Sequence, residues 1–326
     1  MPQSCGGLRR YLPRPRIYKI GGFMLELNDI TLDKKEFINE FLRRRKSKNS
    51  EFSFSYLYMW RKSYDMKYAV IDDMLCVLPK HTDGPRSASF PIGFENPDGT
   101  TRSIKHFIDE LLDYFKESGD EPLIHLYDEN TMKMLVEEFP DKFIITEDRN
   151  NFDYVYRIDE LTKLAGKKFH SKKNHINRFK KLYPDWEYCR LTPENNAECM
   201  NLFDEWQVGK GWEAESISEE REAICEFLNS WASLGYIGGG LRVGGRLVAF
   251  TFGEPLCGDT VVIHFEHVDP ECEGAFTMIN QQFLEHEWQD YTYVNREEDM
   301  GIPGMRKAKE SYHPVFMIKK YVATLK

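Results

Sequence analysis

Residues 260–276 have the residue types and the local pattern of an anion-binding turn. The β-branched run TVVIHFEHV ends at Val268, the sequence DPECEG turns the chain, and Ala275 begins an amphipathic helix. A strand, a tight turn and a helix start place free backbone N–H groups and a positive dipole end at one point. The turn, with Pro270 and Gly274, is a candidate phosphate site, although residue types alone favour an ordinary strand-to-helix connection.

The same strand carries candidate acid–base and metal-ligating side chains, in the sequence His264-Phe265-Glu266-His267. Residues three apart on a strand point to opposite faces, so His264 and His267 are not expected to reach one metal ion. We therefore predict no metal site. Glu266 is predicted to share a face with His264 and to face a cleft beside the turn.

Residues 167–181 (KKFHSKKNHINRFKK) hold seven lysines and arginines and no acidic residue. Since the whole chain has a net charge of −9, removing these seven charges leaves −16 on the remainder. Ile176, Phe179 and Tyr183 form the apolar stripe of a helix, and Lys173 lies on another face. A charge run of this kind is as often a solvated face as a surface that contacts a nucleotide, a lipid headgroup or tRNA.

A third candidate is the charged stretch NREEDMGIPGMRKAKESYHP near the C-terminus. Its acidic cluster precedes a turn, and its basic cluster of Arg306, Lys307 and Lys309 follows Gly304, where a helical turn is predicted. Tyr312 lies close behind. The two clusters could form a surface salt-bridge network. They could also hold a substrate with an amine at one end and a phosphate or carboxylate at the other.

The elements that must position these residues indicate two domains. Helical periodicity over 104–115 alternates along the chain with short β-rich runs, and Gly244-Gly245 predicts a hairpin between LRV and RLVAF. The fold is therefore predicted to be mixed α/β (α+β). The expected organisation is a disordered or mis-started tail at 1–23, an N-terminal domain at 24–155 and a C-terminal domain at 156–326.

The bulk composition of the chain excludes several functional classes. A net charge of −9 argues against binding nucleic acid or membranes by overall attraction, and no apolar run has the ~20 residues of a transmembrane helix. Seven scattered cysteines without a C-x-x-C pair are typical of reduced thiols in the cytoplasm, where we expect the protein. The Walker A, G-x-S-x-G and H-E-x-x-H motifs are absent.

Three segments carry a resemblance to a known family: HFEHVDPECEGAFTMINQQF, VNREEDMGIPGMRKAKESYHP and KKFHSKKNHINRFKKLYP. They resemble the family named after the C-terminal domain of phosphatidylglycerol lysyltransferase. The resemblance covers most of residues 24–326 and is strongest from Lys167 onward. Members belong to the GNAT acyltransferase superfamily and usually hold two such domains in tandem, like Fem-type peptidoglycan aminoacyltransferases. The resemblance therefore implies two tandem GNAT-like domains, with the site in the second.

The resemblance also implies a reaction, namely transfer of an acyl or aminoacyl group from an activated ester or thioester to an amine or hydroxyl. Such enzymes position donor and acceptor, stabilise an oxyanion and remove a proton from the attacking group. It makes Glu266 the candidate general base and Tyr312 a candidate proton donor. Arg306, Lys307 and Lys309 correspond to the family's basic cluster near the acceptor phosphate or the tRNA end.

The candidate donor-binding residues lie in the turn and in the basic segment: Val268, Pro270, Gly274, Ala275, Lys173 and Arg178. Glu271 and Glu273 would repel a pyrophosphate, which favours aminoacyl-tRNA over acyl-CoA as the donor. The expected acceptor is a small molecule or a lipid headgroup, and no tightly bound cofactor is expected. Two alternatives stay open: a CoA-dependent N-acetyltransferase acting on a small amine, and a non-catalytic nucleic-acid-binding protein with the GNAT fold.

Overall fold

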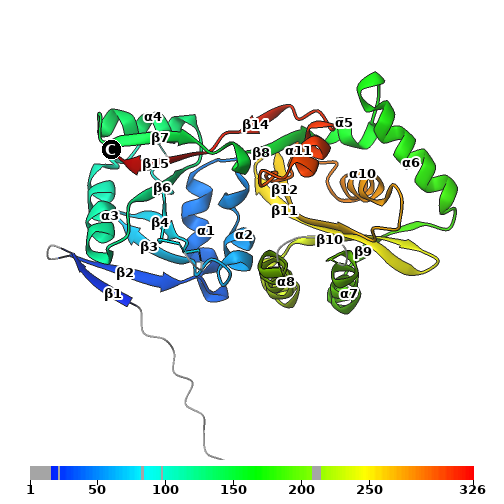
Figure 1. The fold of residues 1–326 in the computed structure, drawn as a ribbon, viewed down its shortest axis with the longest axis horizontal. Helices are drawn as coiled ribbons and strands as arrows, with labels where there is room; N and C mark the ends of the chain where they lie inside the picture. Colours follow the sequence, from blue (N-terminus) through cyan, green and yellow to red (C-terminus); the bar gives the residue numbers. More distant parts are fainter. Residues whose placement is uncertain (1–15, 21–22, 82–83, 97, 208–213) are drawn as a thin grey trace, which may run out of the picture.

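The computed structural model describes residues 16–326 apart from 21–22, 82–83, 97 and 208–213. The chain forms two halves that lie side by side, each with a mixed β-structure covered by helices (Figure 1). The predicted mixed α/β architecture is confirmed.

The first half contains two four-stranded sheets, with the strand orders β1-β2-β3-β4 and β5-β6-β15-β7. Leu75 in β4 exchanges two backbone hydrogen bonds of 2.9 Å with Ile92, just beyond β5, and so links the two sheets. The strands are β1 (Arg16–Ile20), β2 (Phe23–Asp29), β3 (Lys67–Ile71), β4 (Met74–Leu78), β5 (Ala88–Ser89), β6 (Leu123–Leu126), β7 (Phe143–Glu147) and β15 (Tyr321–Leu325).

The helix predicted over 104–115 is confirmed as α3, whose Phe107, Ile108, Leu111 and Phe115 are buried in the core of the first half. Gly119 follows it in the left-handed conformation (φ 79°) and ends it. The helices of this half are α1 (Lys35–Arg44), α2 (Phe54–Trp60), α3 (Lys105–Ser118) and α4 (Glu129–Glu138).

The second half is built on one seven-stranded sheet with the order β14-β8-β13-β12-β11-β10-β9. The predicted hairpin is confirmed between β10 and β11, where Gly244 (φ 56°) and Gly245 (φ 81°) supply the two positive φ angles of a tight turn. The strands are β8 (Asp153–Arg157), β9 (Glu187–Leu191), β10 (Ile237–Val243), β11 (Arg246–Cys257), β12 (Thr260–Val268), β13 (Tyr293–Asn295) and β14 (Phe316–Ile318).

Helices cover both faces of this sheet (Figure 1). One face carries α7 (Asn196–Gln207), α8 (Ala214–Asn229) and the short α9 (Trp231–Leu234), and the other carries α5 (Ile158–Lys163), α6 (His170–Leu182) and α10 (Ala275–Glu287). The last helix, α11 (Pro303–Glu310), lies near the start of β12. Within the described ranges, no helix combines the length and the apolarity needed to cross a bilayer.

The boundaries of the two halves differ from the predicted domains at both ends of the chain. Residues 16–20, assigned to an unstructured tail, form β1, which pairs with β2, whereas residues 1–15 lie outside the described part. Residues 321–325, assigned to the second domain, form β15, which inserts between β6 and β7 of the first half, antiparallel to both. An alternating apolar segment fits either sheet, so its sequence pattern does not reveal its partners.

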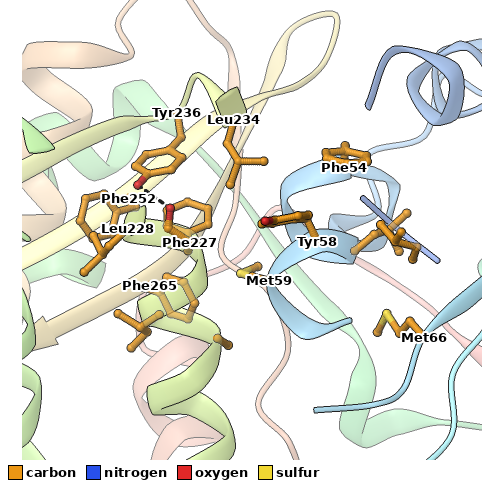
Figure 2. Packing of buried hydrophobic residues seen from close by; sticks show 14 of the residues in the cluster. Phe54, Tyr58, Met59, Met66, Phe227, Leu228, Leu234, Tyr236, Phe252 and Phe265 are labelled. Atoms are coloured by element: carbon orange, nitrogen blue, oxygen red, sulfur yellow. Dashed lines mark hydrogen bonds between the residues drawn. The ribbon is translucent and has the colours of Figure 1, made fainter. Parts of the chain in front are cut away.

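The two halves share one hydrophobic core. Tyr58 and Met59 of α2 belong to the same buried cluster as Phe227 of α8 (Figure 2). Phe252 and Phe265 of the seven-stranded sheet are also members of this cluster. Polar contacts border this core: Arg61 donates a hydrogen bond of 2.5 Å to Glu226, and Ser230 bonds to the Tyr58 hydroxyl at 3.3 Å. Because the apolar contact is continuous, the halves are expected to unfold together.

The substitution Phe227→Ala tests this shared core. Phe227 is fully buried, and its ring stacks on Tyr236 with a centroid distance of 3.8 Å. Truncation should lower the free energy of unfolding by about 3–5 kcal/mol, measured by chemical denaturation, within a single transition that covers both halves. The control Phe276→Ala removes a ring that is 42% exposed and should change the free energy by about 0.5 kcal/mol or less. Separate transitions for the two halves would contradict the prediction.

Candidate functional site

The candidate site lies where β12 and the chain after β13 diverge. The two strands pair in parallel over only three residues, ending at Asn295. Beyond that point Arg296 and Glu297 hydrogen-bond to the backbone of Tyr154 in β8, at 3.0 and 3.1 Å, while β12 continues along β11 to Val268. The later part of β12 therefore pairs on one side only, and polar side chains gather at the opening.

A β-bulge in β12 separates the two polar side chains that were predicted to share a face. The register with β11 shifts between Ile263 and Phe265, which leaves His264 as the extra residue. The His264 ring lies on the α8 side, 5.9 Å from the ring of Phe227, whereas the carboxylate of Glu266 faces α10 on the other side. That prediction is wrong, because a single inserted residue reverses the alternation of the strand.

His264 is fully buried and bridges two carboxylates. Its Nε2 lies 3.0 Å from Glu254, and its Nδ1 lies 2.8 Å from Glu297. Burial alone would lower the pKa of His264, but hydrogen bonds to the two carboxylates raise it to about 9. The carboxylate of Glu254 also accepts hydrogen bonds from Ser53 and Ser55 at the start of α2. The imidazolium thus joins the site to the first half.

Glu266, Tyr312 and a neighbouring arginine form a compact group. Arg296 donates a hydrogen bond of 2.8 Å to Glu266, and Asn280 of α10 lies 3.4 Å from the same carboxylate. The guanidinium carbon of Arg296 sits 4.9 Å from the centre of the Tyr312 ring, and the Tyr312 hydroxyl donates to Thr277 at 3.3 Å. Burial raises the pKa of Tyr312, so its hydroxyl keeps its proton at neutral pH.

Lys309 lies beside this group and connects α11 by hydrogen bonds to the backbone of the chain after β13. Its ammonium donates to the carbonyl oxygen of Arg296 and, at 3.3 Å, to that of Glu297. Glu297 has a left-handed backbone (φ 56°), a conformation that non-glycine residues rarely adopt. Burial lowers the pKa of Lys309, and burial raises the pKa of the adjacent Glu298 to about 7. Lys309 thus holds a strained segment in place.

The other two members of the predicted basic cluster point elsewhere. Arg306 makes a two-pronged ion pair with the buried Asp299, at 2.8 and 2.9 Å, and contacts Asn150 at 3.0 Å. Burial would raise the pKa of Asp299, but hydrogen bonds from Arg306, Tyr154 and the backbone lower it well below its usual range. Lys307 is exposed. Arg306 therefore stabilises the turn, and only Lys309 of the three reaches Glu297.

The turn predicted to bind the donor is covered by helix α6. A Cβ on Gly274 (φ 85°) would lie 2.8 Å from the carbonyl oxygen of His175, so the turn and the helix touch. The Glu271 amide bonds to Asp269 at 2.9 Å, and the Glu273 amide bonds to the Tyr183 hydroxyl at 3.3 Å. Of the four predicted residues in this turn, Pro270 is exposed, Gly274 is half-buried, and Val268 and Ala275 are buried.

The basic helix α6 packs on this part of the second half through Ile176 and Phe179, and its cations divide into two sets. Lys173 is exposed, and Arg178 pairs with Glu273 at 2.7 Å on the surface. Lys172 instead turns inward, with its ammonium 3.8 Å from the centre of the Tyr312 ring. The helix therefore presents one face to solvent and one cation to the candidate site.

Lys172 and Arg296 are the two side chains of the site that the sequence analysis missed. Both stand in the highlighted charged stretches, but their sequence position does not reveal which cation faces inward. Burial and the charge of Arg296 lower the pKa of Lys172 to about 8. A lowered lysine pKa, in a side chain that contacts the group around Tyr312, is typical of functional residues.

The two histidines of β12 have different partners but lie on the same side of the sheet, the side covered by α7 and α8. The prediction that they point to opposite faces is wrong, because the bulge at His264 shifts the alternation by one residue. His267 packs on the α7 side, with ring centroids 4.6 Å from Trp206 and 5.0 Å from Phe203. His264 bridges Glu254 and Glu297. In the part of the chain that the structure describes, no group of three or more His, Cys, Asp or Glu side chains could hold a metal ion.

Comparison with known proteins identifies the family of the chain. Residues 42–324 match the family described as phosphatidylglycerol lysyltransferase, C-terminal. The chain belongs to this family. Its structure is similar to a conserved protein of unknown function from Bacteroides thetaiotaomicron, with 38% sequence identity, a TM-score of 0.85, and coverage of 93% of this chain and 100% of the other.

More distant similarities establish the fold. L-PGS from Bacillus licheniformis is 17% identical, with a TM-score of 0.60 and coverage of 89% of this chain and 91% of that chain. FemX is 10% identical, with a TM-score of 0.55 and coverage of 92% and 97%. The predicted tandem GNAT-like fold is thus confirmed. A curated relative from Mycoplasmoides gallisepticum, 24% identical, aligns over 55% of this chain and 57% of its own length.

The buried His264 predicts a pH-dependent stability. Its pKa is higher in the folded chain (about 9) than the ordinary value of 6.5, so the stabilisation is complete below pH 6.5 and is lost as the pH rises through 9. The shift corresponds to about 3 kcal/mol. Urea unfolding of the wild type and His264→Gln at pH 6 and pH 9.5 should show a difference between the two proteins that shrinks at the higher pH. A constant difference would contradict the protonated bridge.

Proposed function

We propose that the chain is an aminoacyltransferase that moves an aminoacyl group from the ester of an aminoacyl-tRNA to an amine or hydroxyl acceptor. The observation that carries this proposal is the group of Glu266, Arg296, Lys309 and Tyr312 at the open side of β12. These residues supply a carboxylate, a protonated phenol and fixed cations in one place. Membership of the lysyltransferase family supports the class of reaction.

The proposed transfer needs no covalent intermediate on the protein. The acceptor nitrogen or oxygen attacks the ester carbonyl carbon and forms the new bond, and the tetrahedral intermediate then releases the ribose oxygen of the tRNA. Glu266, oriented by Arg296, takes the proton lost by the acceptor. Tyr312 donates a proton to the leaving ribose oxygen. The Tyr312 phenolate then recovers a proton from Glu266, directly or through solvent, so that the net change over one turnover is one proton moved from the acceptor to the ribose. Lys309 positions the segment that holds Arg296.

The surface around the site supports a nucleic-acid donor over CoA. The solvent-facing side of α6 carries Lys173, Lys180 and Lys181, for which no ion pair forms within the described residues. A row of free cations on one helix suits a phosphate backbone. In the turn before α10 the amides of Glu271, Cys272 and Glu273 are already engaged in hydrogen bonds. The exposed carboxylates of Glu271 and Glu273 would also lie near any pyrophosphate bound there.

The substitution Glu266→Gln tests the proposed base. It keeps the shape of the side chain but removes its ability to accept a proton, so aminoacyl transfer from charged tRNA should fall about 10²- to 10⁴-fold. The change also removes the charge that pairs with the buried Arg296 and should lower the melting temperature, so activities are compared at a temperature where both proteins are folded. The assay follows radiolabelled amino acid moving from tRNA to candidate amines and hydroxyl compounds. Glu137→Gln, on the exposed face of α4, is the matched control. Full transfer activity in Glu266→Gln would exclude this role for Glu266.

The identity of the donor has its own test. A ligand present at 100 times its Kd stabilises the folded chain by about 2.7 kcal/mol. We expect acetyl-CoA not to bind, so the melting temperature should not change when it is added.

Binding of tRNA should weaken steeply as the salt concentration rises. The triple change of Lys173, Lys180 and Lys181 to Met should flatten that dependence, because it removes three cations that would contact phosphates. A clear acetyl-CoA shift would favour the N-acetyltransferase alternative. Salt-sensitive tRNA binding without any transfer would favour the non-catalytic one.

A further inference from the structure

Lys172 has surroundings that differ from those of its neighbours in the basic segment. Its side chain is half-buried, and its ammonium lies 3.8 Å from the centre of the Tyr312 ring. Lys168, four residues earlier, pairs with Glu160 at 2.8 Å, and Lys173, the next residue, is exposed. Lys172 is therefore the lysine of this segment that the fold brings to the group around Tyr312.

No direct partner neutralises the charge of Lys172. In the described part of the chain, its ammonium has no carboxylate oxygen within 4.0 Å and no hydrogen bond to the protein. The charged groups that act on it are Arg296 and, with the opposite sign, Glu266. The Glu266 carboxylate is itself paired with Arg296 at 2.8 Å. The Tyr312 ring attracts a cation through its π electrons but supplies no counter-charge.

These surroundings favour the neutral form of the Lys172 amine. Partial burial and the neighbouring guanidinium of Arg296 lower the pKa of Lys172 to about 8, although Glu266 acts in the opposite direction. At pH 8 about half of such an amine is unprotonated, compared with about 0.4% of a lysine with the ordinary pKa of about 10.4. A half-buried lysine next to another cation is a typical activated nitrogen nucleophile.

The amine also lies where the proposed transfer takes place. It contacts the ring of Tyr312, the phenol that protonates the leaving oxygen in the proposed mechanism, and its charge interacts with that of Glu266. The Lys172 side chain stays partly exposed, so a reagent from solvent can reach its nitrogen. An ester positioned for transfer would therefore have a protein amine beside it whenever no acceptor is bound.

We propose that the Lys172 amine is a self-acylation site, which takes an acyl or aminoacyl group from an activated ester when the acceptor is absent. The nitrogen lone pair attacks the ester carbonyl carbon and forms a carbon–nitrogen bond, and the bond from that carbon to the ester oxygen then breaks. The nitrogen gives up one proton, to Glu266 or to water, and the leaving oxygen takes up one. The product is an uncharged amide on Lys172. The inference rests on the proposed function only for the natural donor, an aminoacyl-tRNA.

Chemical acylation of the folded full chain tests the site without tRNA. The chain is incubated at pH 8 with a limiting amount of the N-hydroxysuccinimide ester of acetic acid, and mass spectrometry of its peptides gives the labelling rate of each lysine. We expect Lys172 to be acetylated at least about 5-fold faster than Lys173 and Lys181, which are exposed on the same helix. In concentrated urea the difference should vanish, since it depends on the fold.

The pH dependence of labelling gives a second readout. The rate at Lys172 should level off above pH 9, where its amine is mostly neutral, whereas a lysine with the ordinary pKa of about 10.4 keeps gaining reactivity up to pH 10. Equal labelling of Lys172 and Lys181 in the folded chain overturns the proposal. So does a rate at Lys172 that still rises tenfold between pH 9 and pH 10.

Charged tRNA tests the natural donor. When tRNA carrying a radiolabelled amino acid is incubated with the chain without an acceptor, the protein should acquire a label that resists alkali, because an amide survives conditions that hydrolyse the aminoacyl ester. Lys172→Arg keeps the positive charge and should lose this label, whereas the matched control Lys181→Arg should keep it.

The outcomes separate self-acylation from the transfer reaction. Labelling of Lys172 by the chemical ester but not by charged tRNA supports the reactive amine and contradicts tRNA as the donor in the proposed function. Transfer from charged tRNA to an added amine, without any label on Lys172 in either experiment, overturns self-acylation and leaves the proposed function intact.

Discussion

The structure of the second half depends on the point where β12 and the chain after β13 stop pairing. Two parallel strands that separate leave backbone groups and side chains that need other partners. Arg296 and Glu297 find theirs on β8, while His264 and Glu266 project from β12 to opposite sides. The divergence therefore creates a place where charged groups gather inside the fold.

The charges at this place are kept apart by geometry. On the α8 side, His264 holds Glu254 and Glu297, and on the α10 side Arg296 holds Glu266. The bulge at His264 makes this division possible, because without it both side chains would lie on one face. One side thus becomes a fully paired structural bridge, and the other keeps an excess of positive charge around Tyr312.

The first half supports this arrangement. Helix α2 places Tyr58 and Met59 in the shared core and directs Ser55 to Glu254. Near the end of the chain, Lys320 pairs with Glu51 of the first half at 2.8 Å and with Asp153 of the second at 2.9 Å, just before β15 pairs with β6 and β7 of the first half. These contacts connect both halves to the residues around the site, since Glu254, which accepts a hydrogen bond from Ser55, is bridged by His264 to Glu297.

Local sequence determined much of this protein. Period-3.6 apolar residues predicted α3, the pair Gly244-Gly245 predicted the hairpin, and three charged segments marked the family and the stretches that hold the site. Each of these signals is encoded by neighbours along the chain. The tertiary structure alone decided that β15 pairs with β6 and β7, that Arg306 belongs to Asp299, and that Lys172 faces Tyr312. The physical reason is that each of these contacts joins residues that are far apart along the chain and meet only when the elements pack. Long-range contacts of this kind leave no periodic pattern in the sequence.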